Sequence, residues 1–184
     1  MREWLAAYKY RGQETLAPML ARMMGQAYKL LASELAATSS SSRPWRIDAV
    51  TCVPLSSQRL AERGFNQAEL LASGAAAAAK APLIAMLERT RNTEKMSLKG
   101  RGQRLHSMQG VFRTLPQTEE VLLSVLHKRS NRDSSRKGAR LRLLLVDDIY
   151  TTGSTVGYCS EAILDTCREA GIPAEIYCLT WARS

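Results

Sequence analysis

The hydrophobic residues of this chain fall into runs that predict strands and helices in alternation. The least interrupted run is residues 143–146, Leu-Leu-Leu-Val, which contains no polar position. Such a run is typical of a central parallel strand buried on both faces. Residues 47–53 and 174–181 have the composition of two further strands, and Pro54 ends the first of these. The pattern predicts a mainly parallel sheet with helices between its strands.

Three segments have the three- and four-residue spacing of amphipathic helices. The first covers residues 4–37. The second begins at Asn66, with Glu69 in a variant of the capping box, and runs to about Lys80. The third follows the central strand and ends at Gly171. The predicted buried faces are Leu16, Leu20, Met23, Met24, Ala27, Leu30, Leu31 and Leu35 in the first helix, and Val156, Cys159, Ile163, Cys167 and Ala170 in the third.

Polar segments separate these elements. Residues 38–44, TSSSSRP, have the composition of a flexible linker. Residues 55–64 are expected to form a loop after the first strand. Residues 116–140 have the character of an insertion, in which 127–140 is a basic, serine-containing segment expected to be a mobile or solvated loop.

Length and composition describe an ordinary globular protein. A chain of 184 residues predicts one domain, and 45% hydrophobic with 23% charged residues is typical of that class. No apolar run reaches the length of a membrane helix and the N-terminus lacks a signal-peptide core, so we expect a cytoplasmic protein without membrane insertion. The cysteines contain no C-x-x-C pair, which favours buried free thiols over disulfides or zinc: Cys52, Cys159, Cys167 and Cys178.

The positive charge is concentrated in one part of the chain. Residues 89–142 contain fourteen Lys or Arg against four acids, a net +10, whereas the whole chain carries +9. The remainder of the chain therefore carries −1. A polyanionic ligand or a nucleic acid would be drawn to this basic segment.

The residues after the central strand predict a sugar-phosphate site. Asp147 and Asp148 stand at the end of the strand, and a loop rich in hydroxyls and glycine, Thr151 to Thr155, leads into the following helix. A helix N-terminus attracts a phosphate group, whereas carboxylates suit sugar hydroxyls or a divalent metal. Adjacent acids at a buried strand end are costly without a partner, which disfavours an ordinary turn. Neither a P-loop nor a G-x-G-x-x-G fingerprint is present.

These residues resemble the phosphoribosyl pyrophosphate (PRPP) signature of the type I phosphoribosyltransferases. A narrower resemblance, to the ComF family of phosphoribosyltransferase-like proteins associated with DNA uptake, lies in Arg63-Gly64-Phe65-Asn66-Gln67 followed by DDIYTTGST from Asp147. Further matches to that family occur in order along the chain: Lys9-Tyr10-Arg11-Gly12, Leu87, Arg89, Arg91, Arg104 and Gly110-Val111-Phe112.

The resemblance implies a type I phosphoribosyltransferase-like α/β fold. It would have a mainly parallel central sheet flanked by helices, a small hood or flap at about 88–113, and an N-terminal helix. The whole chain, 1–184, would be one such domain, with a helical segment 1–37, a linker 38–45 and a core 46–184.

The resemblance also implies a ligand and its contacts. The ligand would be PRPP or a related sugar phosphate with Mg²⁺, and the metal would be held largely by ligand and water. The acids would bind the ribose hydroxyls and the loop the 5′-phosphate, while arginines would neutralise the pyrophosphate. The implied PRPP-binding residues are Asp147, Asp148, Tyr150, Thr151, Thr152, Gly153, Ser154 and Thr155, and those on the pyrophosphate side are Leu55, Ser56, Arg59, Arg63, Arg89 and Arg104.

Some family features are absent or altered. The cysteine-rich zinc module that commonly begins the relatives is not in this chain, so no zinc is expected, and the sequence leaves open whether the start is truncated. Several nucleobase-using relatives carry an acid where this chain has Thr151, which cannot act as a general base near neutral pH. No catalytic residue or acceptor base is therefore assigned, and transfer of phosphoribosyl to a nitrogen base, as in nucleoside metabolism, stays open.

Two alternatives accompany the PRPP hypothesis. One is a non-catalytic competence factor that contacts single-stranded DNA or a DNA-processing protein and whose PRPP site is regulatory or vestigial. The other is a purely structural partner-binding protein, which would leave the acid pair without a role. The sequence identifies neither the oligomeric state nor a protein partner.

Overall fold

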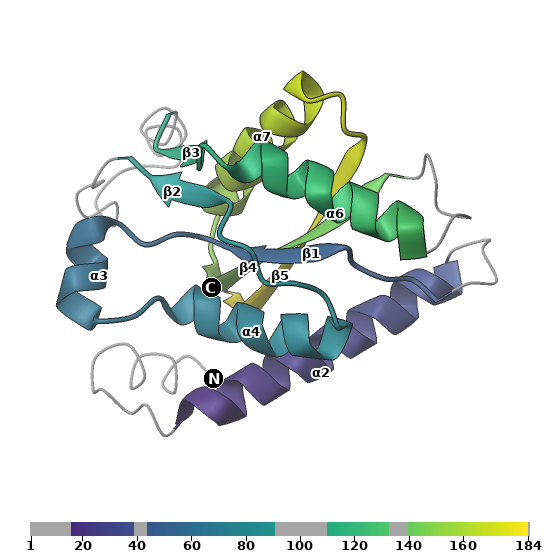
Figure 1. The fold of residues 1–184 in the computed structure, drawn as a ribbon. Coiled ribbons are helices and arrows are strands. Elements are labelled where there is room, and N and C mark those ends of the chain that lie inside the picture. The colour runs from purple at the N-terminus through teal and green to yellow at the C-terminus, as the bar shows by residue number, and fades with distance from the viewer. Residues whose placement is uncertain (1–15, 39–43, 91–109, 133–139, 184) are drawn as a thin grey trace.

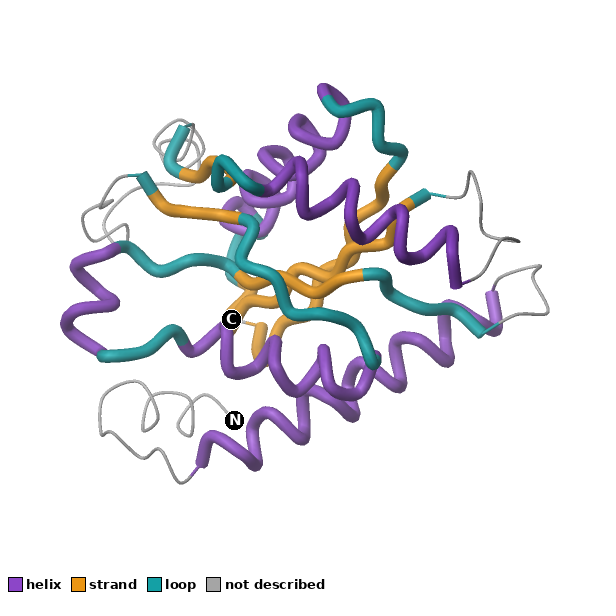
Figure 2. The backbone as a smooth tube through the Cα atoms, in the orientation of Figure 1, coloured by secondary structure: helices purple, strands orange, loops and turns teal. Residues whose placement is uncertain are grey.

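The computed structural model describes residues 16–38, 44–90, 110–132 and 140–183. Helices and strands alternate through most of this chain, as Figures 1 and 2 show. The strands are β1 (Ala49–Cys52), β2 (Leu87–Arg89), β3 (Phe112–Thr114), β4 (Leu141–Tyr150) and β5 (Ala174–Arg183). The helices are α2 (Ala17–Thr38), α3 (Ser57–Arg63), α4 (Gln67–Ala79), α6 (Thr118–Arg132) and α7 (Ser154–Glu169).

The larger sheet is parallel, with the order β1-β4-β5. Leu143 pairs with Ala49 on one side and with Ile176 on the other, so the predicted central strand is central. An isolated parallel bridge joins Val50 to Leu83 beyond β1. This parallel sheet, flanked by helices and preceded in the chain by α2, confirms the predicted α/β fold with a mainly parallel sheet.

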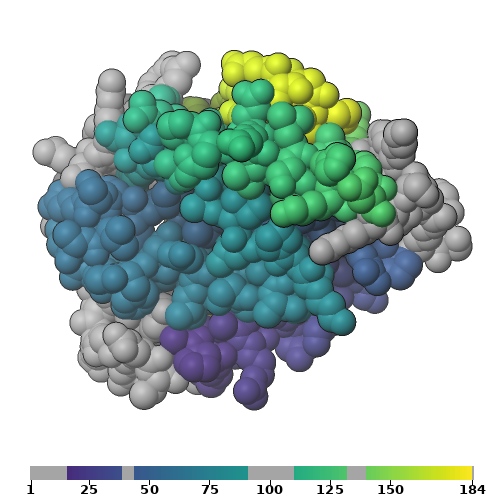
Figure 3. Space-filling model, viewed as in Figure 1, coloured from purple at the N-terminus to yellow at the C-terminus, as the bar shows by residue number. Residues whose placement is uncertain are grey.

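Each face of the sheet has its own hydrophobic core, because successive side chains of a strand point to opposite faces. Leu141, Leu143 and Leu145 belong to a core shared with α6, α7 and the β2–β3 pair. Leu144 and Val146 belong to the other core, with α2 and α4. Figure 1 shows α6 and α7 above the sheet and α4 and α2 below it, and the colours of α2, α4 and α6 follow one another from bottom to top in Figure 3. Leu143 to Val146 are fully buried, as expected for a strand covered on both faces.

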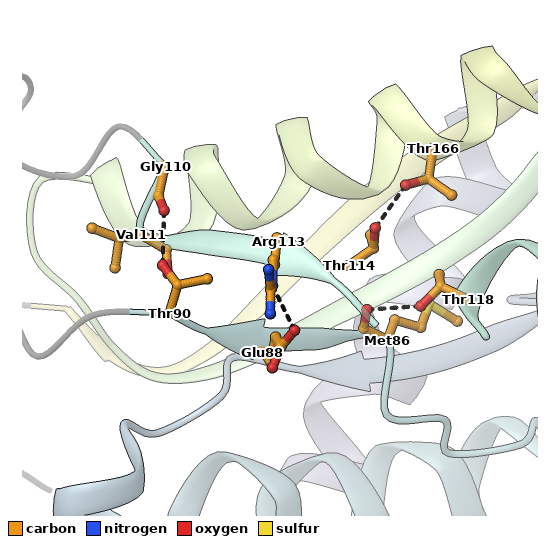
Figure 4. A network of polar contacts seen from close by, with 9 residues as sticks. All are labelled: Met86, Glu88, Thr90, Gly110, Val111, Arg113, Thr114, Thr118 and Thr166. Atoms are coloured by element: carbon orange, nitrogen blue, oxygen red, sulfur yellow. Dashed lines mark hydrogen bonds and ion pairs between the residues drawn. The ribbon is translucent and has the colours of Figure 1, made fainter. Parts of the chain in front are cut away.

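The smaller sheet is the antiparallel pair β2–β3, which Figure 4 shows from close by. The Glu88 carboxylate pairs with Arg113 across the strands at 2.6 Å, and the Thr90 hydroxyl donates to the carbonyl oxygen of Gly110 at 2.8 Å. Thr114 Oγ1 lies 2.9 Å from Thr166 Oγ1 of α7. The pair therefore packs on α7. The flap predicted at about 88–113 stays a prediction, because residues 91–109 lie outside the described part of the chain.

Helices α2 and α4 cross with their backbones in contact. A Cβ atom added to Gly74 would overlap the carbonyl oxygen of Ala21, and one added to Gly25 would come within 2.9 Å of the Gly74 carbonyl oxygen. The buried face of α2 includes Leu20 and Met24, as predicted, together with Tyr28. Met23 and Leu30 were predicted to be buried, and this is wrong: their side chains point away from the crossing and are 39% and 67% exposed.

Two predicted loops are wrong where they prove to be helices. Residues 57–63 form α3, because Ser56 caps its N-terminus and Gly64, at φ 76°, ends it in the left-handed conformation. Residues 118–132 form α6, so the basic loop predicted from residue 127 is helical as far as Arg132. Leu122 anchors this helix in the core. The remainder of that predicted loop, 133–139, lies outside the described residues, and an insertion at 116–140 stays a prediction.

A buried ion pair fixes α6 to the sheet. Arg129 Nη1 lies 3.2 Å from Asp48 Oδ2, and the two side chains are 5% and 3% exposed. The same guanidinium nitrogen donates to the carbonyl oxygen of Arg140, while Asp48 Oδ2 accepts from the backbone N–H of Arg142. The basic residues of α6 are thus not all in solvent, contrary to the sequence interpretation.

The thiols follow the prediction with one exception. All four cysteines are free, and Cys159 and Cys167 are buried. Cys52 is half-buried, whereas Cys178 is exposed because it lies on β5 at the edge of the sheet. Over the residues that the structure describes, no helix is both long and apolar enough to cross a bilayer.

Candidate functional site

The site predicted from sequence lies where β1 ends beside β4. The acids were predicted to stand at the end of the central strand, but β4 continues through them to Tyr150, where it is still paired with β5. Beyond the last pair of the ladder, Cys52 with Val146, the backbone N–H of Val53 still donates to the carbonyl oxygen of Val146 at 2.9 Å. The chain after β1 therefore starts its turn beside Asp147. Ligands of parallel sheets bind at such carboxyl ends of adjacent strands.

Asn66 links the start of α4 to the residue that follows β1. Its side-chain nitrogen donates to the Val53 carbonyl oxygen at 3.1 Å, and its side-chain oxygen accepts from the backbone N–H of Ala68 at 3.1 Å. One side chain thus caps α4, as predicted, and ties the start of α4 to the strand end. Arg63 at the end of α3 donates to Gln67 Oε1 at 3.1 Å, which links the end of α3 to the start of α4.

The two acids stand on opposite faces of the sheet. Asp147 continues the series Leu143 and Leu145, so it points to the side of α7, and Asp148 continues Leu144 and Val146 toward the side of α4. Asp147 is 8% exposed and Asp148 is half-buried. The backbone N–H of Asp148 donates to Asp147 Oδ1 at 2.8 Å. This alternation separates the like charges of neighbouring residues.

The loop after the acids is shaped by Tyr150 and Gly153. Gly153 has a φ of 79°, and a Cβ atom placed on it would lie 2.5 Å from the hydroxyl oxygen of Tyr150. Glycine is needed here for both the conformation and the space. Arg183, at the end of β5, lies over the Tyr150 ring at 5.6 Å from its centroid. The space beside Gly153 is thus occupied by Tyr150, the last residue of β4.

Helix α7 begins without a side-chain cap. The residue at its N-cap is Gly153, whereas α3 and α4 are capped by Ser56 and Asn66. Thr152 Oγ1 lies 2.8 Å from Ser154 Oγ and accepts weakly from the Ser154 backbone N–H at 3.4 Å. Thr155 is half-buried and Thr151 is exposed. Hydroxyls and first-turn N–H groups therefore meet at the positive end of a 16-residue helix.

The charges of two of the predicted arginines act on one another. Burial lowers the pKa of the Arg89 guanidinium, and the nearby positive charge of Arg59 lowers this pKa further. Arg89 also lies over the Phe112 ring at 5.7 Å from its centroid. Arg59 is exposed on α3, and Arg104 lies outside the described residues. Of the remaining predictions, Leu55 is half-buried and Ser56 is the buried cap of α3.

Sequence reasoning missed the thiols beneath the site. Burial raises the pKa of the Cys159 thiol above its usual range; the Asp147 carboxylate raises this pKa further, and Arg89 lowers it. The charges of an acid and an arginine of the site therefore both act on Cys159, which lies on α7. Burial also raises the pKa of Cys52 to about 12, with Glu69 and Asp147 contributing. The apolar stripe of α7 predicted that Cys159 is buried. The side of the sheet to which Asp147 points, which is the side of Cys159, follows only from the alternation of side chains along β4.

The donor set offers oxygens for a hard cation. Carboxylates such as Asp147 and Asp148 are ligands that Mg²⁺ accepts. Among the residues that the structure describes, no group of three or more His, Cys, Asp or Glu side chains could hold a metal ion. The acid pair alone therefore does not provide a full set of metal ligands.

Comparison with known proteins finds similarity over almost the whole chain. No family model matches the chain. Competence protein ComFC of Bacillus subtilis (strain 168) is 30% identical over 172 residues, which covers 94% of this chain and 57% of that protein. The chain thus spans little more than half the length of this relative. A solved structure, TT1426 from Thermus thermophilus, aligns over 88% of this chain and 83% of its own at 14% identity, with a TM-score of 0.35. At that score the structural likeness adds nothing to the assignment.

The fold and the strand-end loop define an α/β protein with a candidate site at the carboxyl edge of a parallel sheet. The similarity to ComFC over almost the whole chain agrees with the ComF resemblance predicted from RGFNQ and DDIYTTGST.

Proposed function

We propose that the protein binds PRPP with magnesium at the carboxyl edge of β1 and β4. The observation that carries the proposal is the acid pair near the carboxyl end of β4, followed six residues after Asp148 by the N-terminus of α7, which has no side-chain cap. The acid pair provides acceptors for sugar hydroxyls, and the helix N-terminus provides donors for a phosphate. A ribose that carries a 5′-phosphate needs both, side by side.

Each part of the ligand has a counterpart in the chain. Asp147 and Asp148 accept hydrogen bonds from the ribose hydroxyls. Residues 151–155 hold the 5′-phosphate through backbone N–H groups and hydroxyls. Arg59 and Arg89, close enough to influence one another, neutralise the pyrophosphate, for which the planar guanidinium fork is well suited. Magnesium supplies further neutralisation of the polyphosphate when it is bound.

The proposal concerns binding first and transfer second. In phosphoribosyltransferases a nitrogen nucleophile attacks C1 of the ribose, the C1–oxygen bond breaks and pyrophosphate leaves. This chain's contribution to such a step is positioning and charge stabilisation by the acids and arginines. Thr151, exposed in the loop, cannot take a proton from an acceptor base near neutral pH. The acceptor base is for this reason left open.

Isothermal titration with Mg-PRPP tests the proposal. The wild-type protein should bind, and the variant Asp147→Asn with Asp148→Asn should lose about 100-fold in affinity, because each carboxylate–hydroxyl bond contributes about 1.5 kcal/mol. The matched control is Asp165→Asn, an acid of α7 whose side chain is 49% exposed and pairs with Arg168. This control should bind as the wild type does. Absence of binding heat for folded wild-type protein up to millimolar Mg-PRPP would contradict the proposal.

A second candidate function is a competence factor that contacts single-stranded DNA, with the PRPP site as a regulatory element. It is favoured by the charge of the chain, a net +10 over residues 89–142, and by the relative whose name is competence protein ComFC. Such a segment would attract a nucleic acid whatever the base sequence of that nucleic acid. The two functions are compatible, because the acid pair and the exposed basic side chains of α6 belong to different elements.

A further inference from the structure

Strand β5 is a long edge strand. It contains ten residues, Ala174–Arg183, and pairs with β4 alone among the strands that the structure describes. Its sequence has none of the devices that usually protect an edge: it has no proline or lysine, and its two charges, Glu175 and Arg183, stand near its ends. Such an edge is a template for a further strand.

The backbone groups available on this edge follow from the ladder with β4. The N–H of Leu141 donates to the carbonyl oxygen of Pro173, which places the odd-numbered residues of β5 in hydrogen bonds with β4. The even-numbered residues, among them Ile176, Cys178 and Thr180, therefore direct their N–H and C=O groups outward. Cys178 is also exposed in its side chain.

The sequence of β5 is complementary to itself in one antiparallel register. With Leu179 opposite Leu179 of a second copy, Glu175 stands opposite Arg183 of that copy at both ends of the ladder. Tyr177 then faces Trp181 of the second copy, again twice. These residues are half-buried or exposed, so their side chains keep surface for a partner. Moving the two-fold axis by one residue to Cys178 places Glu175 opposite Trp181 and removes the charge pairing.

The same register agrees with the backbone. The pairs 175–183, 177–181 and 179–179 consist of odd-numbered residues, so they occupy non-hydrogen-bonded positions, where opposed side chains are closest. The even-numbered pairs 178–180 and 176–182 supply the outward N–H and C=O groups for the new ladder. Charge, aromatic pairing and hydrogen bonding thus select one arrangement.

We propose that two copies of this chain associate through antiparallel pairing of β5, with the two-fold axis at Leu179. The result is a continuous six-stranded sheet with the order β1-β4-β5-β5-β4-β1. This isologous contact closes on itself and removes the exposed edge from both copies. It is independent of the proposed PRPP site.

Sedimentation equilibrium of the full chain at 5–100 μM tests the association. The wild-type protein should be dimeric, and Thr180→Pro should be monomeric at the same concentrations. Proline removes an outward N–H that the second copy would use, while the ladder with β4 is kept. Thr180→Val, which keeps the N–H, is the matched control and should remain dimeric. A monomeric wild-type protein throughout this range would overturn the proposal.

Charge reversal tests the pairing without a change of backbone. Glu175→Arg should weaken the dimer at least tenfold, because it opposes Arg183 of the second copy and also loses its 2.8 Å contact with Arg142. Adding Arg183→Glu should restore dimerisation if the two positions meet across the axis. Failure of the double variant to dimerise, while its circular dichroism spectrum matches the wild type, would overturn the register.

Disulfide trapping locates the axis. Leu179→Cys in a Cys178→Ser background should form a covalent dimer under mild oxidation, because the two 179 positions face one another in a non-hydrogen-bonded pair. Tyr177→Cys in the same background is the control, since its own counterpart lies four residues further along the partner strand. Equal trapping of both variants would contradict an axis at Leu179.

Discussion

At the scale of single residues, Arg129 contributes more to stability than its place in a basic sequence suggests. It bonds Asp48, 81 positions away, and both side chains are nearly inaccessible to solvent. Removing one partner of a buried pair leaves the other charge uncompensated. We expect Arg129→Ala to lower the free energy of unfolding by about 3–5 kcal/mol, as measured by urea denaturation.

The comparison is an exposed pair of the same chemistry. Arg113 contacts Glu88 at 2.6 Å, but its side chain is 69% exposed. Arg113→Ala should therefore change the free energy of unfolding by about 0–1 kcal/mol. If the two variants were equally stable, Arg129 would not hold α6 to the sheet in the way described.

Residues with a local signature were predictable from sequence, and those with distant partners were not. Asn66 was identified as a cap because a helix start has a short-range pattern, and Asp147 and Asp148 because two acids follow a buried strand. The second role of Asn66, its bond to Val53, depends on a neighbour 13 positions away. The partner of Arg129 is likewise set by the fold. The ligand-binding roles of the acid pair and its loop stay predictions.

At the scale of elements, the crossing of α2 and α4 depends on glycine. Because a Cβ atom at Gly74 would overlap the Ala21 backbone, Gly74→Ala forces the helices apart and disturbs the core between them. We expect this substitution to lower the free energy of unfolding by about 2–4 kcal/mol, although alanine is the better helix former. Thermal or urea denaturation followed by circular dichroism measures the effect.

The matched control is a glycine with open space around it. A Cβ atom at Gly157, within α7, meets no described atom within 4 Å. Gly157→Ala should therefore be neutral or stabilising by up to about 1 kcal/mol. A Gly74 variant as stable as this control would show that the two helices can separate without cost.

Elements with a regular spacing of buried residues were predicted from sequence. Elements that depend mainly on their capping residues were not. The central strand and the stripe of α7 have patterns that burial alone explains, and both are present. Helix α3 has seven residues and no buried side chain, so it has no apolar stripe to detect, and its existence depends on the Ser56 cap and Gly64. Helix α6 was missed because its basic second half obscured the buried residues Leu122 and Arg129.

At the scale of the whole molecule, the uneven charge predicts how the protein would meet DNA. If single-stranded DNA binds through about four phosphate contacts, raising salt from 50 to 200 mM should lower the affinity about 50-fold. Fluorescence anisotropy with a labelled oligonucleotide measures this. Lys128→Glu, on the exposed surface of α6, should weaken binding.

The control is a lysine outside the basic segment 89–142. Lys29→Glu changes an exposed lysine of α2, outside the basic segment, and should bind DNA almost as the wild type does. Equal weakening by both variants would indicate a response to net charge alone. Undetectable binding at 50 mM salt would contradict the DNA hypothesis.

The alternation of β4 has a consequence for how the protein would respond to a ligand. Leu143, Leu145 and Asp147 belong to one layer of the molecule, and Leu144, Val146 and Asp148 to the other. A ligand that engages both acids is in contact with two cores that the sheet otherwise keeps apart. Its binding energy would then oppose local opening in either layer, so both would become slower to exchange their amide hydrogens together. Binding at the two neighbouring carboxylates would in this way couple the local stability of the two layers, which would be less coupled in the free protein.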